Sequence, residues 1–290
     1  HLHLLNILKG AIVYADSCTT VSPSYAKEIQ TVEGGCGLNR LLTFYSSKLV
    51  GILNGIDISY WNPETDPLIP HKYSPKNKDQ FFKNKARCKD HLKKRLHLNE
   101  GNKPLIGIVT RLVHQKGLDL IVQALHRTVE TGGQFILMGS SPDPIVTERF
   151  NLLQEAVLPT HEAHLELKHN EILAHQIFAG CDAFIIPSLF EPCGLTQQIS
   201  LKYGTLPIAR RTGGLADTVF DVETSPHQKM GNGFTFDHPT TEGVNWGVDR
   251  TLKTFMHKRI LWQELMIKAA NLDLSWHLPA GQYLQLYGHH

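Results

Sequence analysis

From residue 104 onward, short apolar runs alternate with longer stretches whose apolar residues recur at helical spacing. Short apolar runs bounded by turn residues are typical of buried strands, whereas the longer periodic stretches are typical of amphipathic helices. The pattern predicts strands at 105–109, 134–138, 183–186 and 206–209, and helices at 118–131, 145–155, 195–203 and within 252–271. Strands that alternate with helices in this way predict a parallel sheet, and therefore an α/β fold.

The pattern before residue 104 is less regular. Short strands are predicted at 18–22 and 48–53, and Ser22 followed by Pro23 predicts the start of a helix over 24–30.

Residues 60–75 are rich in proline and polar turn residues, which indicates a domain boundary. Residues 79–98 predict a basic amphipathic helix with its charges in solvent, because the charges have apolar partners at helical spacing.

Composition excludes several classes of protein. A chain of 290 residues with 41% hydrophobic content can form one large or two ordinary domains. The net charge of +2 gives no argument for nucleic acid or a membrane surface as a partner, and no apolar run is long enough to span a bilayer. Five dispersed cysteines without a CxxC pair argue against a disulfide framework or a zinc site and favour a reducing compartment.

The two ends of the sequence indicate a fragment. There is no initiator methionine or secretory signal pattern, and residues 4–15 have the character of a domain interior. The 17 histidines are dispersed, and His289 and His290 suggest a tag remnant rather than a metal site. We therefore expect a longer protein.

Candidate chemistry lies where predicted strands end. Arg111 and Lys116 follow the strand 105–109, and ligands of parallel α/β sheets bind at the carboxyl ends of strands. Together they could neutralise a pyrophosphate without a metal, with arginine bridging two oxygens and lysine acting as a point charge. The alternative is a solvated loop with ordinary surface charges.

A second loop follows the strand 183–186. Glu191 precedes Pro192, and Gly194 and Thr196 stand at the start of the next predicted helix, where backbone amides favour an anion. A carboxylate beside an anion site suits transfer from a nucleotide-activated donor. Alternatively, Glu191 only stabilises the helix start. Cys193 is more often a packed residue than a nucleophile.

A third loop, 210–217, carries two arginines and two glycines after the strand 206–209. A turn with close packing also explains its glycines. Three such loops at one sheet edge strengthen the prediction of a ligand site.

Together these loops resemble the bacterial glycogen synthase and plant starch synthase family. The resemblance covers nearly the whole chain, and the strings FEPCGLTQ and RTGGLADTV make it specific. Residues 138–142 and 220–222 look more like plant soluble starch synthases. The segments that carry the family resemblance are 53–57, 110–117, 190–197, 202–205 and 211–218.

The resemblance implies a GT-B fold, in which two Rossmann-like domains face each other across a cleft. Residues 1–55 would be the end of the N-terminal, acceptor-side domain. Residues 56–274 would be the complete C-terminal, nucleotide-sugar-binding domain, with a hinge near Asn54 and Gly55. Residues 275–290 would form a helix that crosses back to the N-terminal domain.

The resemblance also implies the chemistry. The reaction would be retaining transfer of glucose from ADP-glucose to the non-reducing end of an α-1,4-glucan, with no metal or other cofactor. Glu191, Arg111 and Lys116 match catalytic positions. The residues that match ADP-glucose contacts are Arg111, Lys116, His169, Glu191, Cys193, Gly194, Leu195 and Thr196. Other starch-synthesis proteins are possible partners, and the compartment would be the plastid in a plant or the cytoplasm in a bacterium.

The chain departs from the family in informative ways. The glycine-rich lysine motif and the sugar contacts of the N-terminal domain are absent, so we expect little or no elongation by this chain alone. His169 stands where many relatives have a tyrosine near the adenine. Ile199 replaces the second acid of many other GT-B enzymes, as is common in starch and glycogen synthases.

Two other hypotheses remain at this point. The chain could be a catalytically inactive, synthase-like fragment that binds glucan or a partner synthase. It could also be a nicotinamide-dependent oxidoreductase, but no GxGxxG opens a helix after a first strand.

Overall fold

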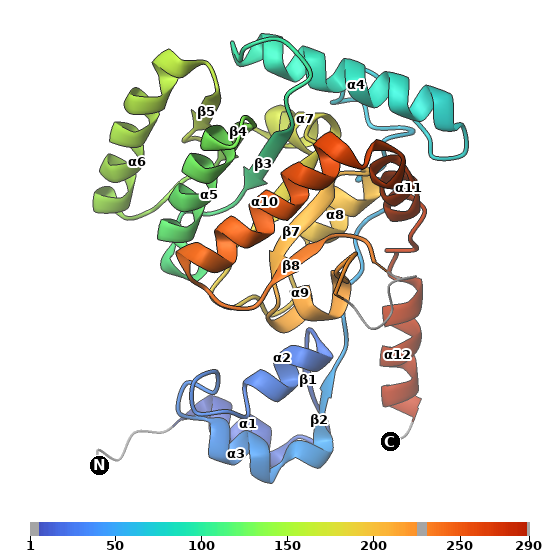
Figure 1. Ribbon diagram of the computed structural model, residues 1–290. Helices are drawn as coiled ribbons and strands as arrows, with labels where there is room; N and C mark the ends of the chain where they lie inside the picture. The colour runs from blue at the N-terminus through green and yellow to red at the C-terminus, as the bar shows by residue number, and fades with distance from the viewer. Residues whose placement is uncertain (1–5, 225–230, 289–290) are drawn as a thin grey trace.

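The computed structural model describes residues 6–224 and 231–288; His289 and His290 therefore lie outside the described part. Its centre is a six-stranded parallel sheet with the strand order β5-β4-β3-β6-β7-β8 (Figure 1). The strands are β3 Leu105–Val109, β4 Gln134–Met138, β5 Ala163–Glu166, β6 Ala183–Ile186, β7 Leu206–Arg210 and β8 Phe234–Phe236. The predicted parallel α/β fold is confirmed.

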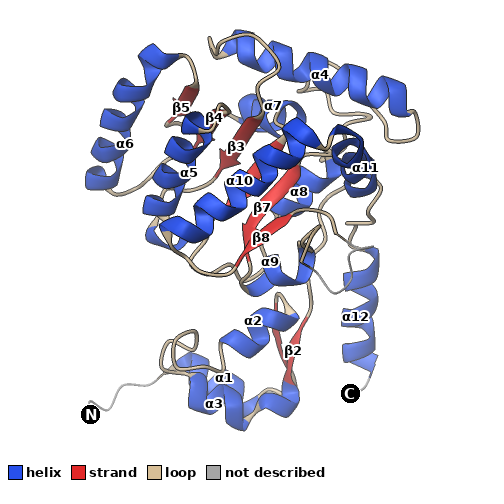
Figure 2. Cartoon of the chain, viewed as in Figure 1, coloured by secondary structure: helices blue, strands red, loops and turns tan. Residues whose placement is uncertain are grey.

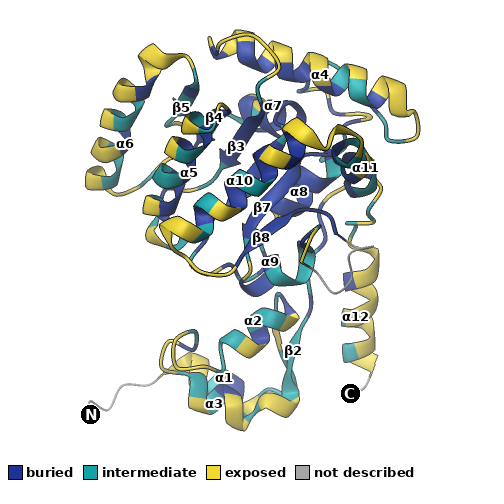
Figure 3. Cartoon of the chain, in the orientation of Figure 1, coloured by how far each residue is buried: buried dark blue, intermediate teal, exposed yellow. Residues whose placement is uncertain are grey.

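Helices cover both faces of this sheet (Figure 2). Helices α5 and α10 pack together on one face, and α7 and α8 contact the other, with α4 against α7 and α11 against α8. The strands and the inward helix faces form a continuous apolar core (Figure 3). The helices are α4 Lys78–Arg95, α5 Leu118–Glu130, α6 Pro144–Val157, α7 Glu171–Gly180, α8 Thr196–Lys202, α9 Gly213–Thr218, α10 Thr241–His257 and α11 Arg259–Ala270, with short 3₁₀ turns η2 His114–Lys116 and η3 Leu158–Thr160.

A small N-terminal part precedes this sheet. It holds a parallel pair of strands, in which Cys18 pairs with Leu49, and Ser22 caps helix α2 through a 2.8 Å bond from the Tyr25 amide, as the sequence predicts. Its elements are α1 Ile7–Tyr14, β1 Cys18–Thr20, α2 Pro23–Glu28, α3 Asn39–Phe44, η1 Ser46–Lys48 and β2 Leu49–Gly51.

Two segments of the chain, near residues 55–56 and 274–275, run side by side between the sheet and the small N-terminal part. The Ile56 amide donates to the Leu274 carbonyl at 2.8 Å, and a Cβ on Gly55 would approach the Ser275 carbonyl carbon at 2.5 Å. Helix α12 His277–Gly288 follows the second passage and extends on the side of the N-terminal part (Figure 1). No helix among the described residues is both long and apolar enough to cross a membrane.

Helix α4 corrects one prediction. The sequence placed its charges in solvent, but Lys85, Lys89 and Lys93 are all buried. Each ammonium group reaches a polar partner beneath the helix: Lys89 pairs with Asp182 at 2.6 Å, and Lys93 donates to the Gly101 carbonyl at 2.7 Å. Long lysine stems can be buried in this way when their tips are hydrogen-bonded.

Lys85 is the most enclosed of these lysines. Its ammonium donates to the carbonyls of Ala179 and Tyr203, both at 3.0 Å, and to the Thr205 hydroxyl at 2.7 Å. Lys85 thereby joins α4 to the C-terminal ends of α7 and α8, where helix carbonyls favour a cation. Burial lowers the pKa of Lys85 to about 8.

We expect this burial to make stability depend on pH. Between pH 8 and 10.5 the unfolded chain keeps a proton on Lys85 that the folded chain has lost, so folding gains free energy as pH rises. The free energy of unfolding of the wild type, relative to Lys85→Met, should rise by about 2 kcal/mol from pH 7 to pH 10. Urea unfolding measures it. Lys83 is exposed on the same helix, so Lys83→Met is the control. A difference in the free energy of unfolding between the wild type and Lys85→Met that does not change with pH would contradict the prediction.

Candidate active site

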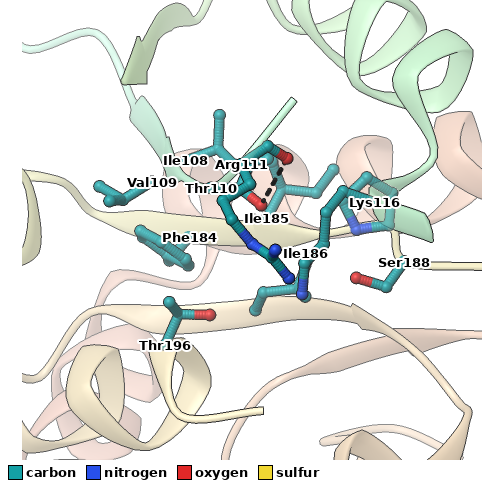
Figure 4. Close-up of a pocket in the computed structure, with 11 residues that line it drawn as sticks. Ile108, Val109, Thr110, Arg111, Lys116, Phe184, Ile185, Ile186, Ser188 and Thr196 are labelled. Carbon is teal, nitrogen blue, oxygen red and sulfur yellow. Dashed lines mark hydrogen bonds between the residues drawn. The ribbon is translucent and has the colours of Figure 1, made fainter. Parts of the chain in front are cut away.

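A cavity of about 210 Å³ opens at the carboxyl ends of β3 and β6. These neighbouring strands are the switch point of the sheet, because the chain continues from β3 toward β4 on one side and from β6 toward β7 on the other. Open α/β sheets bind ligands at such a crevice. The charged ends of Arg111 and Lys116 point into the same space (Figure 4). The lining residues are Ile108, Val109, Thr110, Arg111, Lys116, Phe184, Ile185, Ile186, Pro187, Ser188 and Thr196.

Backbone contacts fix the loop that carries the two cations. The Leu189 amide donates to the Gln115 carbonyl at 2.8 Å, and the Gln115 side-chain amide donates to the Phe190 carbonyl at 3.1 Å. Gly117 has φ of 71°, and a Cβ there would lie 2.5 Å from the Pro187 carbonyl oxygen. A glycine at this position therefore lets the loops after β3 and β6 approach closely.

Replacing Gly117 by alanine should lower the free energy of unfolding by about 1–3 kcal/mol, because left-handed backbone strain adds to a backbone collision. It should also weaken nucleotide binding by displacing Lys116. Gly132→Ala is a matched control: Gly132 has φ of 85° but open space around it, so only the strain applies. Thermal unfolding checks this. Equal losses in the two variants would contradict the predicted collision.

Glu191 is largely buried and is not among the described residues that line this cavity, but it contacts two residues that do. One of its oxygens, Oε2, accepts hydrogen bonds from Lys116 Nζ at 2.6 Å and from Ser188 Oγ at 2.8 Å. The structure thus brings together a carboxylate and a cation that the sequence separates by 75 positions. Sequence reasoning missed Ser188, although a hydroxyl two residues after a buried strand could have indicated it.

His169 lines a neighbouring cavity of about 240 Å³. Val109, Thr110 and Arg111 line both cavities, so the Arg111 loop separates two adjoining spaces. His169 itself is largely exposed and lies two residues before the first residue of helix α7. Sequence reasoning also missed Glu171, which contacts His169, and Tyr60, whose hydroxyl donates to Glu171. Glu171 lies two residues after His169, but nothing in the sequence indicates Tyr60.

The other predicted contact residues are arranged differently. Thr196 lines the first cavity, whereas Cys193, Gly194 and Leu195 are not among the described residues that line either one. Cys193 is buried, and that burial raises the pKa of its thiol. Gly194 has φ of 71° and turns the chain into α8. These positions shape the turn between Glu191 and Thr196.

The loop 210–217 packs against the backbone of the segment that carries Glu191 and Cys193. A Cβ on Gly213 would lie 2.0 Å from the Glu191 carbonyl oxygen, and one on Gly214 would lie 2.0 Å from the Cys193 carbonyl oxygen. Arg210 donates to the Leu189 carbonyl at 2.5 Å, and Arg211 pairs with Asp237 at 2.9 Å. The predicted paired cations therefore bind protein groups beside the cavity and do not line it.

The same loop holds the small N-terminal part. The Gly213 amide donates to Glu28 of α2 at 2.7 Å, and Asp217 accepts from the Ser24 hydroxyl at 2.6 Å and from the Ser24 amide at 2.9 Å. One short helix, α9, therefore contacts both the Glu191 segment and the small N-terminal part.

Comparisons with known proteins identify relatives of this chain. Residues 90–259 match the family described as Glycosyl transferases group 1, and residues 1–44 match the Starch synthase catalytic domain. The glycogen synthase of Protochlamydia amoebophila is 49% identical over 98% of this chain and 58% of its own length. The probable starch synthase 4, chloroplastic/amyloplastic, of Arabidopsis thaliana is 45% identical over 98% of this chain and 27% of its own.

A solved structure has the same fold. The catalytic domain of Starch Synthase IV from Arabidopsis thaliana, bound to ADP and acarbose, superposes with a TM-score of 0.92 at 45% identity, covering 98% of this chain and 58% of that one. A sucrose-phosphate synthase from Thermosynechococcus elongatus, 18% identical with a TM-score of 0.64 over 98% of this chain and 60% of that one, shares the fold.

The parallel α/β sheet and the superposition on the starch synthase structure confirm the predicted GT-B fold class. Within that class the chain belongs to the family of starch and glycogen synthases. It spans 58% of the length of the Protochlamydia relative.

Proposed function

We propose that this chain carries the donor site of an enzyme that transfers glucose from ADP-glucose to an α-1,4-glucan. The observation that carries the proposal is the contact between Lys116 and Glu191 beside a cavity that Arg111 and Thr196 also line. This contact places the positive charge of Lys116, which suits a diphosphate leaving group, next to the Glu191 carboxylate, which suits a sugar with developing positive charge.

In the proposed reaction, the bond from glucose C1 to the distal phosphate oxygen breaks, and a bond forms on the same face from C1 to the 4-oxygen of the acceptor. The electron pair of the broken bond leaves with ADP, and the proton of the acceptor hydroxyl passes to the departing phosphate oxygen. Arg111 and Lys116 stabilise the negative charge that grows on ADP. Glu191, held by Lys116 and Ser188, faces the positive charge that grows on the sugar ring. The proposal includes no metal ion or other cofactor, because the two side-chain cations supply the charge.

His169 is the proposed contact for the adenine, since it lines the cavity that adjoins the diphosphate position. The α-glucan is the proposed acceptor, bound across the cleft. Other starch-synthesis proteins are further proposed partners. The proposed compartment is the plastid if the source is a plant and the cytoplasm if it is a bacterium.

Transfer of labelled glucose tests this function. The chain, joined to the N-terminal half of a relative, should incorporate label from ADP-glucose into an α-1,4-glucan, and Glu191→Gln should abolish incorporation while the protein stays folded. Binding of glucan without any incorporation would favour the inactive, synthase-like fragment instead.

A further inference from the structure

Glu171 is the first residue of helix α7 and contacts two aromatic side chains from different parts of the chain. Its Oε2 lies 3.1 Å from His169 Nε2, and its Oε1 accepts a hydrogen bond from the Tyr60 hydroxyl at 2.7 Å. The hydrogen bond from Tyr60 lowers the pKa of Glu171, with His175 and His169 acting in the same direction. An ionised carboxylate therefore lies directly beside the ring at the second cavity.

The helix that carries Glu171 has a rigid base. Asn170 caps α7 by accepting from the Leu173 amide at 3.0 Å. Below it, His175 Nδ1 lies 2.7 Å from Asp66 Oδ2, its other ring nitrogen lies 3.4 Å from Glu171 Oε1, and Trp61 stacks on the ring at 4.2 Å.

The contacts of His175 with Asp66 and Trp61 join the segment 60–66 to helix α7. His175 is 1% exposed and the Asp66 side chain is fully enclosed. Asp66 also accepts from the Tyr203 hydroxyl and, at 2.8 Å, from the Leu68 amide. Glu171 is thus fixed from both sides, by its own helix and by Tyr60.

We propose that Glu171 is a positioning residue for nucleotide recognition: it holds the exposed His169 ring in the orientation that packs on the base. The His169 side chain is 73% exposed, so without this tether it would sample several rotamers. A ring ordered in advance loses less rotamer entropy when a base binds. This inference rests on the proposed donor site, but it concerns the base and not the diphosphate.

A double-mutant cycle on ADP affinity tests the inference. Glu171→Ala should weaken ADP binding about 3- to 10-fold, because it removes a charged hydrogen bond and a rotamer restraint. In a His169→Phe background, where the ring cannot bond to a carboxylate, the same change should weaken binding less than about 2-fold. Tyr60→Phe, which removes only the hydroxyl that holds Glu171, should show the same dependence on His169 at smaller size.

Inorganic pyrophosphate, which has no base, separates this inference from the proposed function. Its binding should be unchanged by Glu171→Ala and weakened by Arg111→Ala. Equal losses of ADP affinity in the wild-type and His169→Phe backgrounds would show that Glu171 acts through the fold. No loss in either background would show that Glu171 has no effect on nucleotide binding. Either result overturns this inference and leaves the proposed donor site unaffected. Absence of ADP and pyrophosphate binding in the wild type would overturn the donor site and this inference together.

Discussion

Replacing Arg111 by alanine is expected to weaken ADP binding about 10- to 100-fold. A charge-assisted hydrogen bond contributes about 1.5–3 kcal/mol, which corresponds to about 10- to 100-fold in affinity. The side chain lines both cavities and is exposed, so its removal should leave the unfolding midpoint nearly unchanged. Calorimetric titration with ADP and a thermal melt measure the two quantities separately.

The matched control for this prediction is Arg149→Ala. Arg149 pairs with Asp119 on the surface at 2.7 Å and lines neither cavity. Its loss should leave ADP affinity as in the wild type. If Arg111→Ala binds ADP as tightly as Arg149→Ala does, the cavity at the carboxyl ends of β3 and β6 is not the diphosphate site.

Replacing Lys116 by methionine is expected to reduce stability as well as ADP affinity. The Lys116 and Glu191 side chains are 18% and 9% exposed, so the change leaves a nearly buried carboxylate with Ser188 as its remaining described donor. Removing one partner of a buried ion pair costs about 3–5 kcal/mol, and the partial exposure of this pair places the expected loss near 2–3 kcal/mol. Urea unfolding gives this value directly.

A second substitution identifies the cause of that loss. Glu191→Gln in the Lys116→Met background removes the unpaired charge and should restore more than half of the lost stability, without restoring ADP affinity. Lys116→Arg keeps the charge and should unfold near the wild type. If Lys116→Met is as stable as the wild type, the contact with Glu191 contributes little and cannot be what holds the carboxylate.

The strands and loops that carry the site could be predicted from the sequence because each is a local pattern. The strand 105–109 and the cations after it lie close together in the sequence, as do the strand 183–186 and Glu191. Parallel topology then places their carboxyl ends at one edge. The confirmed α/β fold therefore needed no information on which strands are neighbours.

Contacts between distant segments could not be predicted in this way. No local signal shows that Glu28 bonds to the Gly213 amide, or that Gly213 and Gly214 lie against the backbone of Glu191 and Cys193. The same limit explains helix α4: its lysines follow an amphipathic pattern, but the carbonyls and the carboxylate that allow their burial lie in other segments, Asp182 among them.

Short edge strands were a further limit. β5 Ala163–Glu166 and β8 Phe234–Phe236 lie at the two ends of the sheet, and both are brief. Half of β5 is only partly buried, so its sequence lacks the continuous apolar run that marked β3, β4 and β6. Helix α10 begins at Thr241, well before the predicted 252, because its first turns have mixed polarity.

The most direct test of the donor site is a titration of this chain with ADP-glucose, followed by ADP as a competitor. We expect saturable binding at one site, displacement by ADP, and binding about 10- to 100-fold weaker in Arg111→Ala but unchanged in Arg149→Ala. Absence of saturable binding by a folded chain, or binding that Arg111→Ala leaves intact, would contradict the proposal that the cavity at the carboxyl ends of β3 and β6 holds a nucleotide-activated glucose.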